Sequence, residues 1–169
     1  VLRFVYCLVF DPPSLRGSFG EMQVNFAAWF HLDERVYRRL SNVTLQVNGS
    51  TTQIDHIIIS RYGIFVLETK NYGGWIYGRE REAKWTAKHY RRTFRFQNPL
   101  RQNYGHVKAI SELFQVPEHH IQSIVVFVGD SEFKTEMPPN VVRHAKFVGY
   151  IERYTEVVFT DAQVDDLYN

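Results

Sequence analysis

Two apolar runs in this chain, separated by a short polar turn, are each interrupted by acidic residues. The first run covers residues 53–59 and contains Asp55, and the second covers residues 64–70 and contains Glu68 and Lys70. A buried carboxylate without a partner costs several kcal/mol, whereas a whole domain is stable by only about 5–15 kcal/mol. The sequence therefore predicts that a cation or hydrogen bonds compensate these acids.

The two runs are rich in isoleucine, valine and phenylalanine, which predicts an antiparallel hairpin with its loop at residues 60–63. This register sets Ile59 opposite Ile64 and therefore Asp55 opposite Glu68. Directly opposed residues have Cβ atoms about 4.5–5.5 Å apart, close enough for both carboxylates to share one divalent ion. A shift of one residue would separate the two acids onto opposite faces of the sheet.

Strand alternation also sets Lys70 on the face of Glu68, whereas the Thr69 side chain points away and leaves its backbone carbonyl as a ligand. Two carboxylates and a lysine at the end of a sheet suit metal-assisted cleavage of a phosphodiester. A cross-strand salt bridge between Lys70 and the two acids is an equally good interpretation of this spacing alone.

Composition limits the class of protein. The chain has 169 residues, of which 44% are hydrophobic, and its formal net charge is +2. These values predict one globular domain with a sizeable core, and they do not by themselves indicate a nucleic-acid partner. The single cysteine, Cys7, excludes an internal disulfide and a cysteine zinc site. No stretch reaches the roughly 18 apolar residues that a membrane span needs.

Residues 1–10 are nearly all apolar, which fits the end of a longer helix, such as a membrane anchor, or a strand that packs on the domain; an ordinary packed or frayed segment is the simpler interpretation. A helix should begin at Ser18, because Ser18 and Glu21 have the spacing of a capping box. An apolar stripe extends this predicted helix as far as Leu40. Glu21 has two expected roles that are compatible, as a helix cap and as an additional acid of the site.

A segment without acids follows a predicted short strand at residues 75–78 and a hairpin tip at residues 80–82. Aromatic residues alternate in it with basic side chains, which are Lys84, Lys88, Arg91, Arg92 and Arg95. Basic side chains neutralise phosphates and exposed aromatic rings stack on bases, so the segment is a candidate nucleic-acid surface. A solvated strand face is the alternative interpretation.

Asn98 and Pro99 predict a helix start, and the apolar stripe that follows should end before Pro117. Gln102 and His106 are one helical turn apart and share a flank, from which they would orient a water or a phosphate; an exposed flank without a role is the simpler interpretation. The remaining predicted elements are a central strand over residues 121–129, a strand over 145–149, and peripheral helices over 151–156 and 162–168.

Four motifs in order resemble the nuclease-related domain (NERD) family of bacterial proteins, over about two thirds of the chain. The motifs are Gly20-Glu21, residues 53–57, residues 63–71, and residues 96–103 with His106 after them. The resemblance implies an α/β fold with the restriction-endonuclease-like core of the PD-(D/E)XK superfamily, in which helices flank a mixed central β-sheet. We therefore expect a nuclease-related domain at residues 16–150, preceded by an apolar segment and linker at 1–15 and followed by a peripheral segment at 151–169.

The resemblance also implies a site, in which Glu21, Asp55, Glu68, Lys70 and Gln102 are catalytic and the two strand acids, the Thr69 carbonyl and Glu21 hold Mg²⁺ or Mn²⁺. The expected activity is a Mg²⁺-dependent (endo)deoxyribonuclease that acts in DNA processing or defence. DNA is the expected partner, contacted by the basic segment and by His106. The expected location is cytoplasmic, with tethering to the membrane as an option. The alternative is a non-catalytic nucleic-acid-binding or membrane-tethered scaffold module on the same fold.

Overall fold

The computed structural model describes residues 31–47 and 49–169. The N-terminal segment at 1–15 and the predicted helix start with Glu21 lie outside the described residues. The described elements, in chain order, are β1 (Tyr37–Val47), β2 (Ser50–Ser60), β3 (Gly63–Lys70), β4 (Gly74–Tyr77), β5 (Lys84–His89), β6 (Arg92–Gln97), α2 (Pro99–Phe114), the short 3₁₀ helix η1 (Glu118–His120), β7 (Ile121–Phe127), β8 (Ser131–Phe133), β9 (Val141–Arg143), α3 (Lys146–Ile151) and α4 (Asp161–Tyr168).

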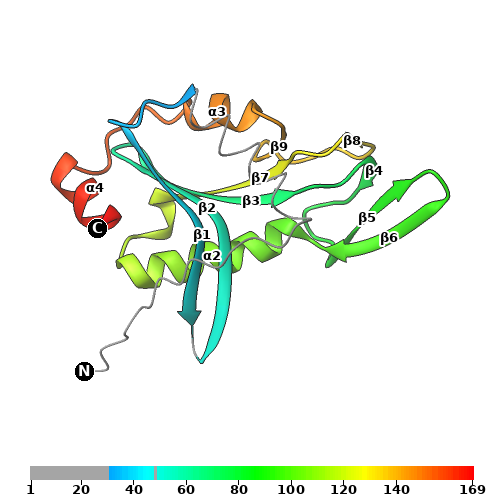
Figure 1. The fold of residues 1–169 in the computed structure, drawn as a ribbon, viewed down its shortest axis with the longest axis horizontal. Coiled ribbons are helices and arrows are strands. Elements are labelled where there is room, and N and C mark those ends of the chain that lie inside the picture. Colours follow the sequence, from blue (N-terminus) through cyan, green and yellow to red (C-terminus); the bar gives the residue numbers. More distant parts are fainter. Residues whose placement is uncertain (1–30, 48) are drawn as a thin grey trace.

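A five-stranded mixed sheet with the order β1-β2-β3-β7-β9 forms the centre of the molecule. Helix α2 covers one face of this sheet and α3 lies against the other, so the fold has three layers (Figure 1). Strand β7 lies between β3 and β9 and is parallel to both. The predicted central strand and the mixed α/β arrangement are therefore confirmed. None of the described helices has the length and apolar content that crossing a membrane requires.

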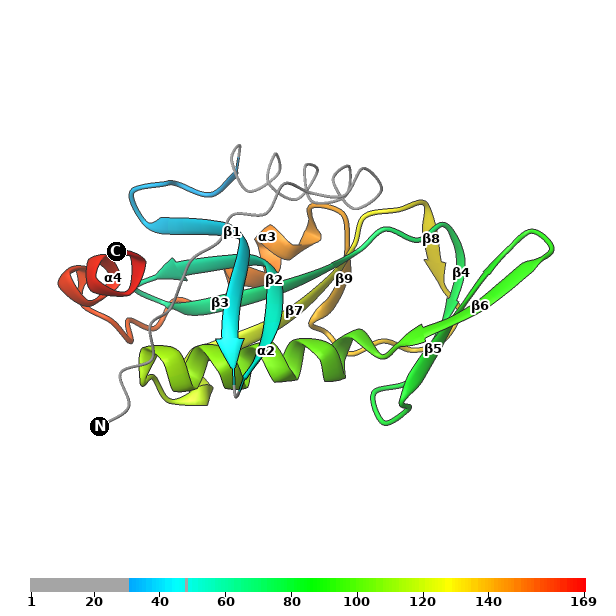
Figure 2. The same cartoon turned by 60° about the horizontal axis from the view of Figure 1, so that its bottom comes forward.

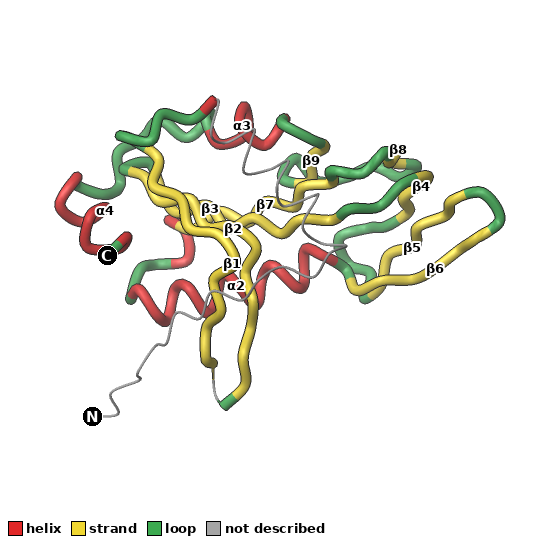
Figure 3. The backbone as a smooth tube through the Cα atoms, viewed as in Figure 1, coloured by secondary structure: helices red, strands yellow, loops and turns green. Residues whose placement is uncertain are grey.

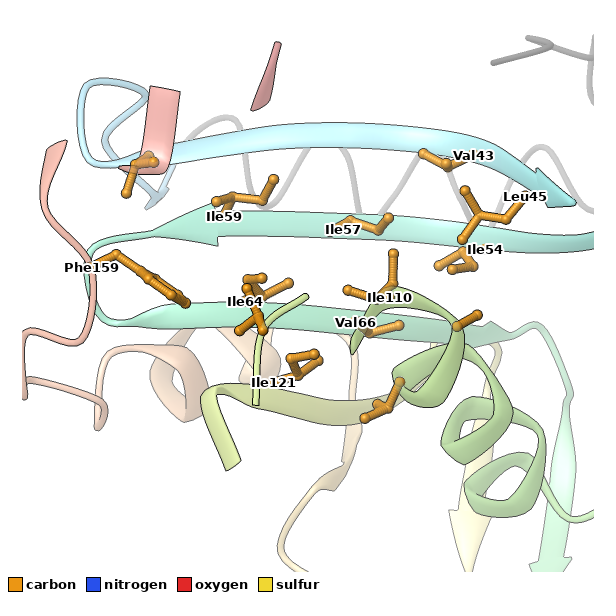
Figure 4. Close-up of a cluster of buried hydrophobic side chains, with 14 residues drawn as sticks. Val43, Leu45, Ile54, Ile57, Ile59, Ile64, Val66, Ile110, Ile121 and Phe159 are labelled. Carbon is orange, nitrogen blue, oxygen red and sulfur yellow. The ribbon is translucent and has the colours of Figure 1, made fainter. Parts of the chain in front are cut away.

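Side chains on the two faces of β2 and β3 alternate between two separate cores. Ile57 and Val66 face α2, where they lie close to Ile110 (Figure 4). Phe65 and Leu67 face the opposite way and pack with α3. Because both faces are covered, the two strands are apolar at nearly every position, as strands buried on two sides are.

The β2–β3 hairpin has the predicted register. Ile59 lies opposite Ile64, and the ladder ends with His56 opposite Leu67. The turn is shorter than predicted, because Ser60 also pairs with Gly63 and leaves only residues 61–62 in the loop.

The predicted extension of the first helix to Leu40 is wrong. The chain turns at Asp33, whose carbonyl oxygen accepts the backbone N–H of Val36 (2.9 Å) and of Tyr37 (2.8 Å). Strand β1 then begins, and Leu40 pairs with Ile57 of β2. The apolar spacing of this stretch fits a helix as well as a strand, and long-range pairing with β2 decides between them.

A four-stranded sheet with the order β6-β5-β4-β8 extends the first sheet. Strands β3 and β7 continue through short loops into β4 and β8, as the backbone tube in Figure 3 shows. Lys70 lies opposite Phe127, and farther along Gly74 lies opposite Ser131, so the parallel register is unchanged across the two loops. The β5–β6 hairpin projects at the end of the molecule opposite α4 (Figure 2).

Helix α2 begins where it was predicted. The Asn98 side chain accepts the N–H of Leu100 (2.9 Å), and Pro99 occupies the first turn. The Asn98 amide also donates to the carbonyl oxygens of Glu80 (2.9 Å) and Glu82 (2.6 Å) in the turn before β5. One side chain thus caps the helix and joins it to the second sheet.

The C-terminal part differs from the prediction at residues 145–149, which belong mainly to α3 and not to a strand. Two strands in this part were missed, β8 and β9, because three residues each are too few to show a period. Residues 151–156 are largely irregular, while α4 confirms the last predicted helix. Phe159 and Val164 from this region are buried in the α2-side core.

Asn42 gives a test of the local backbone of β1. Its φ is 53°, a left-handed conformation that asparagine and glycine tolerate and β-branched residues do not. We expect Asn42→Val to destabilise the fold by about 1–2 kcal/mol, measured by urea unfolding. Asn42→Gly is the matched control and should lose clearly less. Equal losses in the two variants would contradict a backbone origin of the effect.

Candidate active site at the end of strands β2 and β3

Asp55 and Glu68 lie on the α2 side of the sheet, one step beyond the last pair of the β2–β3 ladder. Extending the pairing of His56 with Leu67 by one residue sets the two acids opposite each other. On the face that packs on α2, each acid is the next side chain beyond an apolar one toward this end of the hairpin: Asp55 lies beyond Ile57, and Glu68 lies beyond Val66. The sequence-derived juxtaposition of these two acids is thus present in the fold.

The ladder is interrupted on both sides of Asp55. Toward β1, Ser41 pairs with His56 and Val43 pairs with Ile54, but the pair between them, Asn42 with Asp55, is missing. Asn42 has a left-handed backbone conformation. Toward β3 the Asp55 carboxylate replaces the ladder, since its Oδ2 accepts the backbone N–H of Thr69 at 2.7 Å. Asp55 therefore connects the two strands through its side chain at the point where backbone pairing ends.

Burial raises the pKa of Asp55, against the hydrogen bond from Thr69 and the charge of Lys70, which lower it. The side chain of Glu68 is only 3% exposed. Burial, followed by the charge of Asp55, raises the pKa of Glu68 to about 7, although Lys70 and Gln102 act in the opposite direction. Burial thus disfavours the ionised form of both carboxylates, the charge of Asp55 adds to this effect at Glu68, and a cation between them would favour the ionised forms.

Lys70 is the cation nearest to Glu68, with its Nζ 2.6 Å from Glu68 Oε1. The same Nζ donates to Gln102 Oε1 at 3.1 Å, so α2 holds the lysine in place. The other carboxylate oxygen, Glu68 Oε2, is buried and has no hydrogen-bond partner among the described residues. Its neighbour is His106 Nδ1 at 3.5 Å.

The structure corrects the expectation for the flank of α2. Gln102 is half-buried and contacts Lys70, and His106 is only 4% exposed, so neither is a free surface side chain. Burial, together with the charge of Lys70, lowers the pKa of His106 to about 4, and the imidazole is neutral at pH 7. A neutral, buried His106 is unsuited to the phosphate contact expected from the sequence, and it lies beside Glu68 instead.

Asn103 is a supporting residue that sequence reasoning missed. It is 0% exposed, and its amide donates to the carbonyl oxygens of Val66 (2.8 Å) and Ile124 (3.2 Å) and to Ser123 Oγ (2.9 Å). It thereby binds α2 to β3 and β7, between the two helix residues that face the site. The sequence did contain an indication of this role. Asn103 lies three residues after Leu100 on the apolar stripe of the helix, where a polar side chain needs hydrogen-bond partners.

The two carboxylates fit a hard divalent cation, because Glu68 Oε2 is an orphaned oxygen beside a second acid. Residues 31–47 and 49–169 contain no group of three or more histidine, cysteine, aspartate or glutamate side chains placed to hold a metal. Any cation would therefore depend on Asp55 and Glu68, together with ligands that are not such side chains or lie outside these residues. Glu21, the expected additional ligand, lies in the part of the chain that is not described.

The basic segment is the β5–β6 hairpin, and its cations do not form one patch. Cross-strand pairing sets Lys84, Lys88 and Arg95 on the outer face, opposite the face that carries buried Trp85. Arg91 lies in the turn at the tip, and Arg92 begins β6 on the side of Trp85. None of these five cations forms an ion pair with an acid in the described ranges.

Comparison with known proteins agrees with this geometry. The family model of the nuclease-related domain matches residues 16–128. An uncharacterized protein of Bacillus anthracis is 40% identical over 162 residues, which cover 93% of this chain and 76% of that protein. No solved structure matches the chain significantly. The two mixed sheets with flanking helices are consistent with a restriction-endonuclease-like fold, and with its matched domain the chain belongs to the nuclease-related domain (NERD) family.

Proposed function

We propose that this protein is a Mg²⁺-dependent nuclease that hydrolyses phosphodiester bonds of DNA. The observation that carries the proposal is the half-buried Asp55 beside the buried Glu68, with Lys70 at 2.6 Å from Glu68, at the end of two core strands. Membership of the nuclease-related domain family supports it. An ion pair with Lys70 needs only one acid, and the Asp55 Oδ2 that accepts the Thr69 N–H joins the strands without needing a second negative charge beside Glu68.

The Asp55 and Glu68 carboxylates would hold the ion, with the Thr69 carbonyl and Glu21 as proposed further ligands. A divalent cation there supplies Lewis acidity, which lowers the pKa of a water molecule and offsets charge on the phosphate. Lys70 would orient the attacking water and stabilise the negative charge that develops on the phosphoryl oxygens. Gln102 holds the Lys70 ammonium through their 3.1 Å hydrogen bond, and would keep it aimed at the reacting group.

The β5–β6 hairpin would supply part of the DNA contact. Arg91 and Arg92 lie at its projecting end, exposed and without an ion pair to any described acid. Cations of this kind release counterions from the phosphate backbone, which makes binding dependent on salt. The hairpin is therefore the proposed arm that positions the substrate relative to the two acids.

Removing the charge of either acid should strongly slow DNA cleavage. We expect Asp55→Asn and Glu68→Gln to lower the rate of DNA cleavage in Mg²⁺ by about 10²–10³-fold, as the loss of several kcal/mol of metal-derived stabilisation requires. Cleavage of labelled duplex, single-stranded and branched DNA, with EDTA as the metal-free control, measures the effect. Metal-dependent cleavage at the wild-type rate in both variants would refute the site, and DNA binding without any cleavage by the wild type would indicate a scaffold module.

Glu68→Gln also separates the catalytic from the structural interpretation by pH. The folded protein keeps a proton on Glu68 up to about pH 7, above the ordinary value of 4.5, so metal-free wild type loses stability as the pH rises through this window. The variant carries no such charge and should therefore melt higher than wild type at pH 8, by about 2–4 °C per kcal/mol gained, with the difference shrinking toward pH 5. A lower melting temperature at pH 8 would show that the ion pair with Lys70 stabilises the fold.

Lys70→Ala should separate catalysis from metal binding. We expect single-turnover cleavage to fall by about 10²-fold, as when a charge that stabilises the transition state is removed. Calorimetry should show that Mn²⁺ still binds, because Lys70 competes with a cation for Glu68. Lys70→Arg should restore activity only in part, since a planar guanidinium cannot place its charge where the compact ammonium lies. A wild-type rate in Lys70→Ala would exclude the catalytic role.

Reversing the charge at the hairpin tip should weaken DNA binding and not the cleavage step. For Arg91→Glu with Arg92→Glu we expect lower affinity for duplex DNA. The slope of log K against log salt concentration should become shallower by about 0.9 for each phosphate that the variant no longer neutralises. The matched control is Arg153→Glu, an exposed arginine on the loop after α3. The measurement is a binding titration in EDTA at several salt concentrations. If affinity and salt dependence equal those of the control, the tip does not bind DNA.

A further inference from the structure

The second sheet has one packed face and one open face. Ile76, Trp85 and Ala87 are fully buried on the inner face, where they pack with Val125 and Phe127 of β7. These two β7 residues pair with Glu68 and Lys70 of β3, so the inner face adjoins the side of the sheet that bears the candidate active site. The outer face points away from that site.

Trp75 lies on the open face, 44% exposed, whereas Trp85 on the inner face is completely buried. Gly74 sets this position, because its φ is +82° and a Cβ there would lie 2.4 Å from the carbonyl oxygen of Lys88. The close approach places Trp75 directly opposite Lys88 in the β4–β5 ladder. The Trp75 ring is thus held on the surface by its position in a strand, and it does not lie on a flexible loop.

Two lysines flank the ring. The Lys88 Nζ lies 5.7 Å and the Lys134 Nζ 4.9 Å from the centre of the Trp75 ring, both within cation–π range. Lys134 also pairs with Glu132, which lies opposite Trp75 on β8. The indole and its basic neighbours therefore form one continuous group across β8, β4 and β5.

The charge of this face is positive and uncompensated. Lys84, Lys88 and Arg95 lie on it, and none of them pairs with an acid of the described chain, whereas Glu132 is occupied by Lys134. Phosphates complement such a surface, but phosphates alone would not require an exposed indole. An exposed ring amid cations has a specific partner in an unpaired base, because every base presents a flat π-face when it is not stacked in a duplex.

We propose that the outer face of the second sheet is an accessory site for an unpaired nucleic-acid strand, with Trp75 stacking on a base and Lys84, Lys88 and Arg95 contacting the backbone. The inference rests on the proposed function in taking nucleic acid as the substrate, and it specifies substrates that carry a single-stranded part. Because the face points away from Asp55 and Glu68, the strand bound there is a tether and not the strand being cut.

The test measures binding in EDTA, so that neither metal nor cleavage enters the result. Labelled oligo(dT), oligo(rU) and a blunt duplex are titrated with the full chain and with Trp75→Leu, Trp75→Phe and Tyr104→Leu. Tyr104 is the matched control, because it is 56% exposed on α2 with Lys108 5.3 Å above its ring. Lys88→Glu with Arg95→Glu is the second variant of the face, in case Trp75→Leu does not fold.

We expect Trp75→Leu to weaken binding of the single strands about 5- to 100-fold, as the loss of a stacked base predicts, and to change duplex binding much less. Trp75→Phe should keep most of the affinity, and Tyr104→Leu should behave as wild type. The charge variant should weaken binding of single strands as well. Weaker binding of either oligo(dT) or oligo(rU) supports the proposal. The oligonucleotide whose binding weakens more shows whether the face prefers a DNA or an RNA strand.

Three results would overturn it. Unchanged single-strand affinity in Trp75→Leu and in the charge variant would show that the face is not the site. Equal loss of affinity for duplex and single strands would leave a phosphate patch without stacking. Binding to vesicles with anionic lipid, abolished in Trp75→Leu, with no oligonucleotide binding, would make the face a membrane surface. A failure of cleavage does not affect this result, so the proposed nuclease activity and the accessory site fail separately.

Discussion

The hydrogen bond from the Thr69 backbone to Asp55, at 2.7 Å, holds β2 and β3 together where their ladder has ended. Up to this point the hairpin is an ordinary core element, with isoleucine opposite isoleucine. Beyond it, the β2–β3 ladder is replaced by the Asp55 side-chain contact, whereas the β1–β2 ladder skips one position and resumes with Val43 opposite Ile54. The candidate site is located at this transition, because only there can carboxylates stay close to a rigid core and still approach a substrate.

Helix α2 completes the site because it is fixed to the sheet by a polar contact and not by apolar packing alone. Asn103 donates to the backbone of β3 and β7, which are neighbouring parallel strands. That contact sets the rotation of the helix, so that Gln102 meets Lys70 and His106 lies beside Glu68. Apolar packing alone would tolerate a small rotation of α2, whereas three hydrogen bonds from one buried amide would not.

The second sheet depends on the first in a similar way. Strands β4 and β8 extend β3 and β7 with the same register, so the position of the β5–β6 hairpin follows from the central sheet. Asn98 joins the base of this hairpin to the start of α2. The strands of the candidate site, the helix that supports them and the β5–β6 hairpin are therefore parts of one framework, in which a displacement of β3 would move all of them.

Much of this arrangement was determined by the sequence itself. The hairpin register follows from apolar alternation and turn residues, and it brings Asp55 opposite Glu68 without further information. The start of α2 follows from Asn98 and Pro99, because capping is a local interaction. The continuous apolar run of β7 likewise identified a strand covered on both faces.

Only the tertiary structure decided features that depend on contacts between distant residues. The stretch ending at Leu40 fits a helical period but pairs with β2, and residues 145–149 form α3 where their composition suggested a strand. His106 was expected on the surface and is buried beside Glu68, because the rotation of α2 is set by Asn103 and not by local spacing. The basic segment divides between two faces of a hairpin, since strand pairing, which no single segment encodes, determines which side of a sheet each side chain occupies.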